Sequence, residues 1–204
     1  MGVTTMLVLA CLASVAADVL HVSHVPKTGG TVLTKSLKHC GYKVHSREMR
    51  LAGQPRTTLL RNPFEHVPSM YAHCRAARYS PHAKTPRGDN VTHGFDMWLD
   101  AALRGNSADR HIADCYNPNN FMVRFYGGTL DAAMRYLDDT VVGLTVEALL
   151  AYYNCPVREF SHGSWPRIST LTEGQRKKIV ELAALDLALY AYAGGIAVTN
   201  NTES

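Results

Sequence analysis

The chain has 204 residues, of which 46% are hydrophobic and 19% charged, and a formal net charge of +4 at pH 7. This balance excludes a disordered chain, and the length suits one compact domain with an apolar core. The weak positive charge favours an anionic ligand such as a nucleotide or an acidic glycan. It argues against nucleic acid, which strongly basic domains bind.

The first seventeen residues form a segment of their own. From Thr5 to Ala17 the chain is almost wholly apolar or small, and small residues precede Asp18, which is typical of a secretory signal. No Lys or Arg precedes the apolar run. A buried first element of the domain and the clipped end of a longer protein therefore stay open as alternatives. We expect residues 1–17 to be a signal peptide that can also associate with a membrane, and residues 18–204 to be a single domain.

The cysteines are Cys11, Cys40, Cys74, Cys115 and Cys155. No Cys-x-x-Cys spacing occurs among them, so the sequence predicts no zinc site. Disulfides formed in a secretory lumen and buried free thiols are equally consistent with this pattern. The glycosylation sequons at Asn90 and Asn200 matter only if the chain is secreted.

The first predicted element is a buried strand from Val19 to Val25, which is apolar and rich in β-branched residues, and Pro26 ends it. Residues 27–31, reading Lys-Thr-Gly-Gly-Thr, follow as a tight turn. Apolar residues then recur at helical spacing until Gly41 closes the helix. Strand, glycine turn and helix form the first unit of an α/β sheet.

The remaining elements continue this alternation along the chain. They are a strand at Tyr42–Ser46, a strand at Thr57–Leu60, a helix at Phe64–Tyr79, a polar loop at Ser80–His93 and a helix at Phe95–Leu103. There follow a loop at Tyr116–Asn120, a helix at Thr129–Leu137, a strand at Thr140–Leu144, a helix at Glu147–Tyr153 and one long helix from Thr172 to Gly194-Gly195. The alternation predicts a three-layer α/β/α domain with a mostly parallel central sheet.

The turn at residues 27–31 has the composition of a phosphate-binding loop. Glycines let the backbone approach a phosphate, and the following helix offers unpaired N–H groups and the positive end of its dipole. Lys27 adds a positive charge and Thr31 a hydroxyl. Because the lysine precedes the glycines, the loop does not match the Walker A pattern of P-loop kinases. Taken alone, the turn is equally consistent with an ordinary strand-to-helix connection.

The wider string His-Val-Pro-Lys-Thr-Gly-Gly-Thr at residues 24–31 resembles the 5′-phosphosulfate loop of the membrane-associated and carbohydrate sulfotransferases. The second signature of that family is an Arg-Asp-Pro run after a strand, with a serine eight positions beyond the arginine. Here Arg61 follows the third expected strand and Ser69 holds the matching position. Asn62 stands in place of the usual aspartate and His66 in place of the usual arginine. The two motifs occur in the order that the family shows.

The resemblance implies a P-loop NTPase-like sulfotransferase fold and transfer of a sulfuryl group from 3′-phosphoadenosine 5′-phosphosulfate (PAPS) to a hydroxyl, with no metal. It places Lys27 at the bridging oxygen as a catalytic residue. The other residues that it implies in PAPS binding are Thr28, Gly29, Gly30, Thr31, Val32, Arg61 and Ser69. Ser161 and His162, with Arg167 downstream, resemble the late PAPS-contacting loop of the uronyl 2-O-sulfotransferases.

The acceptor half of the site carries fewer signals. An acceptor hydroxyl needs a general base, and the family places a histidine or glutamate just past the second strand. His45 is therefore the candidate base and Glu48 the reserve. By the same resemblance we expect a carbohydrate acceptor and a location in the Golgi lumen, with the cytosol as the alternative.

Three alternatives stay open for the function as a whole. The first is a non-catalytic relative that binds a nucleotide or glycan, and the second is a P-loop kinase. The third follows from length, because the chain is shorter than typical carbohydrate sulfotransferases. A smaller acceptor, or an inactive copy, would explain the difference.

Overall fold

The computed structural model describes residues 19–52, 55–76, 91–105, 116–157, 168 and 170–198. Within these ranges the strands are β1 (Leu20–His24), β2 (Val44–Arg47), β3 (Arg56–Leu59) and β4 (Val141–Gly143). They form one sheet in the order β2-β1-β3-β4, and every neighbouring pair is parallel. The α/β class and the four strands predicted from the sequence are confirmed.

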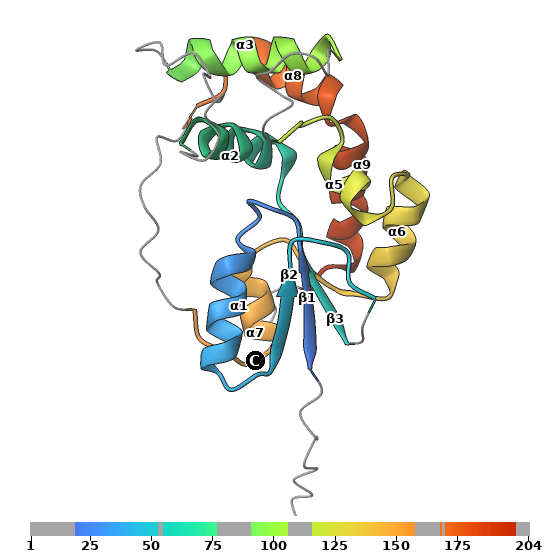
Figure 1. Ribbon diagram of the computed structural model, residues 1–204. Helices are drawn as coiled ribbons and strands as arrows, with labels where there is room; N and C mark the ends of the chain where they lie inside the picture. The colour runs from blue at the N-terminus through green and yellow to red at the C-terminus, as the bar shows by residue number, and fades with distance from the viewer. Residues whose placement is uncertain are drawn as a thin grey trace, which may run out of the picture.

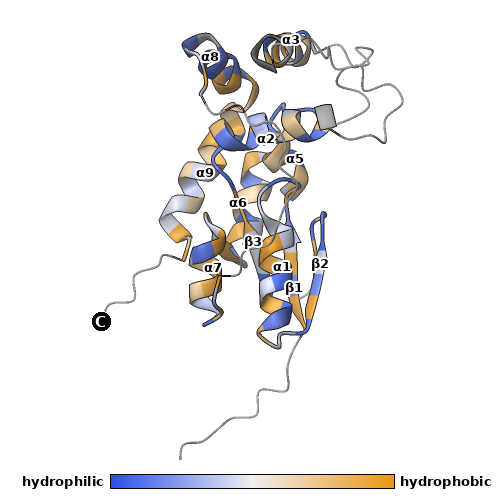
Figure 2. Cartoon of the chain, turned by 90° about the vertical axis from the view of Figure 1, so that its left-hand side faces the viewer, coloured by the Kyte–Doolittle hydropathy of each residue, from blue (hydrophilic) through white to orange (hydrophobic). Residues whose placement is uncertain are grey.

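Helices cover both faces of this sheet (Figure 1). One face carries α1 (Gly30–His39) and α7 (Val146–Tyr152), and the other carries α5 (Phe121–Tyr126), α6 (Leu130–Asp138) and α9 (Ala184–Ile196). Alternate residues of the strands serve the two faces, as the pleat requires. Leu20 and Val22 join the core beneath α1 and α7, whereas Val25 joins the core beneath α5, α6 and α9. Figure 2 shows the corresponding mixture of hydrophobic and hydrophilic residues along α1.

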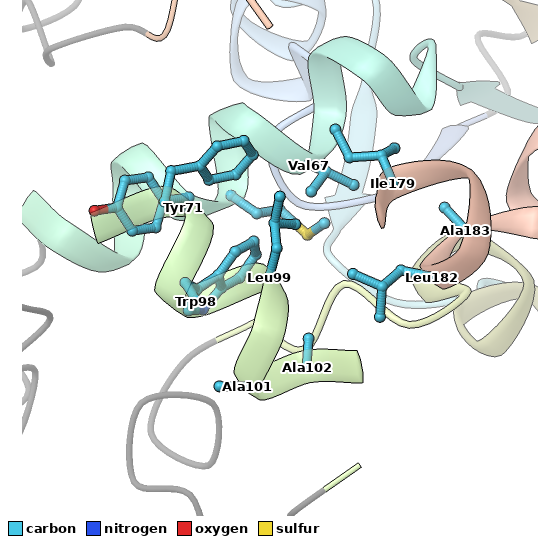
Figure 3. Close-up of a cluster of buried hydrophobic side chains, with 11 residues drawn as sticks. Val67, Tyr71, Trp98, Leu99, Ala101, Ala102, Ile179, Leu182 and Ala183 are labelled. Atoms are coloured by element: carbon cyan, nitrogen blue, oxygen red, sulfur yellow. The ribbon is translucent and has the colours of Figure 1, made fainter. Parts of the chain in front are cut away.

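A third group of helices lies beyond the carboxyl ends of the strands and consists of α2 (Pro63–Ala76), α3 (Val91–Leu103) and α8 (Glu173–Leu182). These helices share a core of their own, in which Tyr71 and Trp98 pack at a ring-centroid distance of 5.6 Å (Figure 3). Ile179 and Leu182 of α8 close this core from the other side. The group forms a roof above the edge of the sheet where the β1 and β3 strands end.

The long C-terminal helix expected from the sequence is wrong, because the chain bends by 85° between α8 and α9. The expected capping box at Thr172 is present at the start of α8. Asn120 holds the corner, since its backbone N–H donates to Leu182 O at 3.0 Å and its side-chain oxygen accepts from Leu185 N at 2.8 Å. Among the described residues no single helix is long and apolar enough to cross a membrane, and the bent pair α8 and α9 meets that criterion only jointly.

Helix α5 does not figure among the elements expected from the sequence. The Asp186 carboxylate caps it by accepting from Met122 N at 3.1 Å and Val123 N at 2.9 Å. Burial raises the pKa of Asp186 to about 6. The predicted loop at residues 80–93 falls mostly outside the described residues, but its last three positions already belong to α3.

Two observations decide between disulfides and free thiols for the described cysteines. Cys40 at the end of α1 and Cys155 after α7 form a disulfide, with their Cα atoms 5.9 Å apart. Cys74 on α2 is disulfide-bonded as well. The described cysteines are therefore not buried free thiols.

Candidate functional site

A cavity of about 620 Å³ lies at the carboxyl ends of β1, β2 and β3, under the roof helices α2 and α8. β1 lies between β2 and β3 in the sheet, so the chain goes from β1 to its neighbour on one side and then crosses to its neighbour on the other side. The cavity is therefore at a topological switch point, where open α/β sheets bind their ligands. Its lining comes from the first loop and the start of α1, from Glu48 after β2, from α2, and from residues in and just before α8.

Most of the predicted site residues meet in this cavity. Those that line it are Lys27, Gly29, Gly30, Thr31, Val32, Arg61 and Ser69. Thr28 and His45 are not among the lining residues, whereas Glu48, the reserve base, is. Ser161, His162 and Arg167 lie outside the described residues.

The first loop is a hydrogen-bonded turn. Thr28 N donates to Val25 O at 3.3 Å, and the Thr28 hydroxyl donates to the same carbonyl at 2.8 Å. The hydroxyl of Thr28 is thus used within the loop, and its side chain is buried. Lys27 adopts a positive φ of 70°, a conformation that residues other than glycine rarely take. Gly29 follows at φ 103° as the N-cap of α1.

Gly30 opens helix α1 directly against the ring of His24. A Cβ atom on Gly30 would lie 2.1 Å from the His24 Cγ, so only glycine fits there. His24 is buried. Burial lowers the pKa of His24, and the nearby Glu48 charge opposes this shift. The close packing leaves the backbone of Gly30 and Thr31 beside the cavity. The N–H groups in the first turn of an α-helix have no carbonyl acceptor within that helix, so they can donate to a ligand.

The second residue of the second motif, Asn62, caps helix α2. Phe64 N donates to the Asn62 side-chain oxygen at 2.9 Å, and Glu65 N donates to its carbonyl at 2.9 Å. Asn and Asp are equivalent caps, so the replacement of the family's aspartate preserves the start of the helix. Helix α2 continues through Pro68, and Ser69 still lines the cavity.

Arg61, the first residue of the second motif, links it to the first loop. Its Nε donates to the Glu65 carboxylate at 3.2 Å, and its Nη1 donates to Lys27 O at 3.2 Å. The guanidinium has five N–H donors, so these contacts leave others for a ligand. His66 makes a second link, because its Nε2 lies 2.8 Å from Pro26 O. Arg61 and His66 thus hold two successive carbonyls of the first loop.

Another part of the cavity lining is formed around Glu48, which follows β2. Ser23 Oγ donates to Met49 O at 2.7 Å and so anchors the backbone beside Glu48. Burial lowers the pKa of Lys27, and the Glu48 charge opposes that shift as well. His73 on α2 is half-buried and stacks on Tyr116, with ring centroids 5.6 Å apart. Burial and then the Lys27 charge lower the pKa of His73.

His45 has a different environment. It is exposed on β2. Its ring packs edge-on against the His21 ring, with the ring centroids 5.3 Å apart, and Arg47 Nε donates to its Nε2 at 3.2 Å. It lies in register with the second residue of β1, well before the carboxyl edge where the cavity opens. The family resemblance predicts His45 as the base just past the second strand. In the structure β2 continues to Arg47, so His45 lies on the sheet and Glu48 lies at its carboxyl edge.

The far wall of the cavity consists of residues that the sequence did not single out. Phe64 of α2, with Ile168 and Leu171 before α8, makes this wall apolar. Arg176 of α8 lies over the Phe64 ring, with its Cζ 5.6 Å from the centroid. An apolar wall with an aromatic ring and a cation over that ring, in the same cavity as a phosphate-type loop, suits a nucleoside.

No protein-family model matches the chain, and no curated protein or solved structure matches it either. The case for a function therefore rests on the two motifs and on the cavity that they share.

Proposed function

We propose that this chain is a sulfotransferase that takes its sulfuryl group from PAPS and has the P-loop sulfotransferase type of fold. The observation that carries the proposal is the convergence of both motifs on one cavity. Lys27 and Arg61 are 34 positions apart in sequence, yet the Arg61 side chain donates to the Lys27 carbonyl and both residues line the same space. Because β1 and β3 are parallel neighbours, the segments that follow them meet at this edge of the sheet. The support for the proposal therefore comes from the residues that meet there, a lysine and glycines from one segment and an arginine and a serine from the other.

We propose a role for each part of the cavity. The N–H groups at the start of α1 and the Lys27 ammonium would hold the 5′-phosphosulfate. Arg61 and Ser69 would hold the 3′-phosphate, because an arginine fork and a hydroxyl are suited to a dianion. The apolar wall with Phe64 would receive the adenine, and Arg176 would add a second positive charge beside it.

Sulfuryl transfer requires an in-line attack by the acceptor oxygen and stabilisation of charge on the leaving oxygen. Glu48 is the proposed general base in preference to His45, because Glu48 lines the cavity with Lys27. The acceptor O–H proton passes to the Glu48 carboxylate as the new S–O bond forms. The bond between the sulfur and the oxygen that bridges to the 5′-phosphate breaks, and its electron pair stays on the departing adenosine 3′,5′-bisphosphate. Lys27 neutralises the negative charge that develops on this oxygen.

The disulfides bear on the compartment. Disulfides persist in oxidising compartments and are rare in the cytosol, so the Cys40–Cys155 bridge supports secretory handling. We propose the Golgi lumen as the location and a carbohydrate hydroxyl as the acceptor. Membrane association through residues 1–17 stays a prediction, because those residues lie outside the described ranges.

The function is tested by incubating the protein with sulfur-35-labelled PAPS and a panel of glycan acceptors. Transfer is expected with the parent, with a loss of about 10²–10⁴-fold in kcat for Glu48→Gln. Lys27→Ala should also lose transfer, and Lys38→Ala, an exposed lysine of α1 outside the cavity, should match the parent. Binding of PAPS without transfer to any acceptor would indicate a non-catalytic relative, and magnesium-dependent ATP turnover would indicate a kinase.

A further inference from the structure

The first loop holds its lysine in an uncommon conformation. The hydrogen bond from Thr28 N to Val25 O closes a four-residue turn with Pro26 second and Lys27 third. Proline second and a positive φ third define a type II turn, whose third position usually needs glycine or asparagine. Lys27 has a φ of 70° and takes that position instead. Such conformations persist only where the surrounding structure holds them.

His66 contacts the central peptide of this turn from outside the turn. Its Nε2 lies 2.8 Å from Pro26 O, and the ring is buried with an edge contact to Phe121 at 6.0 Å. Burial, with the Arg61 charge adding to it, lowers the pKa of His66 to about 4. The ring is therefore neutral near pH 7, and because Pro26 O can only accept a hydrogen bond, the tautomer that donates from Nε2 is the stable one.

The orientation of the Pro26–Lys27 peptide decides the conformation of Lys27. In a type I turn the third residue has a φ of about −90°, and in a type II turn about +80°, and the two differ by a flip of this central peptide. A flip would turn the Pro26 carbonyl away from His66 and leave the buried imidazole N–H without an acceptor, which is costly. The hydrogen bond from His66 therefore selects the orientation in which Lys27 has its positive φ.

We propose that His66 is a positioning residue that, by donating to Pro26 O, fixes Lys27 in the orientation that serves the 5′ side of the bound nucleotide. The inference rests on the proposed function and deepens it, because it makes recognition of the 5′-phosphate depend on a side chain of the second motif. Arg61 contacts the adjacent Lys27 carbonyl from a more exposed position, so His66 is the fixed member of the pair. The replacement of the family's usual arginine by a neutral histidine thus has a structural use in this chain.

The test compares two ligands in the same protein by calorimetric titration: adenosine 3′,5′-bisphosphate and adenosine 3′-monophosphate. His66→Met removes the donor but keeps a flexible apolar side chain, and His66→Gln keeps an amide donor. His66→Met should weaken the bisphosphate about tenfold and the 3′-monophosphate less than twofold, since only the 5′ contacts depend on Lys27. His66→Gln should recover most of the loss, and His39→Met, an exposed histidine of α1, should change neither affinity.

The ratio of the two affinities is independent of the folded fraction, because partial unfolding weakens both ligands equally. Equal weakening of both ligands in His66→Met would reduce His66 to a purely structural role and overturn the inference. Failure of the parent to bind the bisphosphate would instead reject the proposed function. The NMR signal of the His66 Nε2–H proton tests the inference without variants. It should shift when adenosine 3′,5′-bisphosphate binds and stay unchanged when adenosine 3′-monophosphate binds. A signal that responds to neither ligand would also overturn the inference.

Discussion

The contact between Gly30 and His24 leads to a specific prediction for Gly30→Ala. The new methyl carbon would lie 2.1 Å from His24 Cγ and 2.3 Å from its Nδ1, where carbon contacts normally need about 3.5–4.0 Å. The His24 side chain is only 8% exposed, so the ring cannot move without displacing its neighbours. Overpacking of this kind costs about 1–3 kcal/mol, and alanine recovers up to about 1 kcal/mol through its helix propensity. We expect a net loss of about 1–2 kcal/mol and a Tm lower by about 2–8 °C.

Thermal unfolding followed by circular dichroism measures this change, with Gly194→Ala as the matched control. Gly194 is also helical, but among the described residues no atom apart from its chain neighbours and the nearby backbone of its own helix lies within 4 Å of the position that its Cβ would take. Alanine at residue 194 should therefore leave Tm unchanged or raise it slightly. If Gly30→Ala proved as stable as Gly194→Ala, the packing of His24 beneath the first turn of α1 would be refuted.

Protonation of His66 should destabilise the protein in mild acid. Because its folded pKa is lowered to about 4 from an ordinary 6.5, its stabilising contribution is full above pH 6.5 and is lost as the pH falls toward 4. Protonation of His66 should lower the free energy of unfolding in urea by about 2 kcal/mol between pH 7 and pH 5, and His66→Gln should lack this drop. The same pH dependence in the parent and in His66→Gln would contradict the lowered pKa of His66. The double variant Cys40→Ser/Cys155→Ser should lose about 4–5 kcal/mol in the same assay, because its disulfide spans 115 positions, and a loss below about 1 kcal/mol would contradict this. Glu65→Gln should bind adenosine 3′,5′-bisphosphate about twofold more tightly at low salt, since it frees the Arg61 guanidinium, and weaker binding would show that Glu65 assists the site.

The strands and the first loop could be predicted because their signals are local. The β-branched run before Pro26 and the glycines after it specify a strand, a turn and a helix without reference to the rest of the chain. The lysine, the glycines and the threonine of the phosphate-type loop are also contiguous in sequence, which is why the loop could be found. The loop conformation could not, since the positive φ of Lys27 depends on His66 of the second motif.

The bend between α8 and α9 shows why the C-terminal helix was predicted wrongly. The apolar residues continue through the bend at helical spacing, so nothing local marks it. The corner depends on Asn120, which lies more than sixty positions earlier in the chain. Helix α5 was missed for the same reason, because its cap is the distant carboxylate of Asp186.

The candidate site also has residues that the sequence identifies and residues that only the structure identifies. Arg61 and Ser69 could be identified by their spacing, but the choice between His45 and Glu48 could not be made. His45 and Glu48 are three positions apart, and only the end point of β2 decides which of them reaches the edge of the sheet. His73 is one of ten histidines in the chain, and only its place on α2 relates it to the cavity.

The most direct test of the central claim is calorimetric titration of adenosine 3′,5′-bisphosphate into the parent, Lys27→Ala and Arg61→Ala, with Arg135→Ala on the exposed side of α6 as a control. The parent should bind in the micromolar range at one site. Each cavity variant should lose about 1.5–3 kcal/mol, or about ten- to a hundredfold in affinity, and the control should lose nothing. A well-folded parent that does not bind, or binding that neither cavity variant weakens, would contradict a nucleotide site shared by the two motifs.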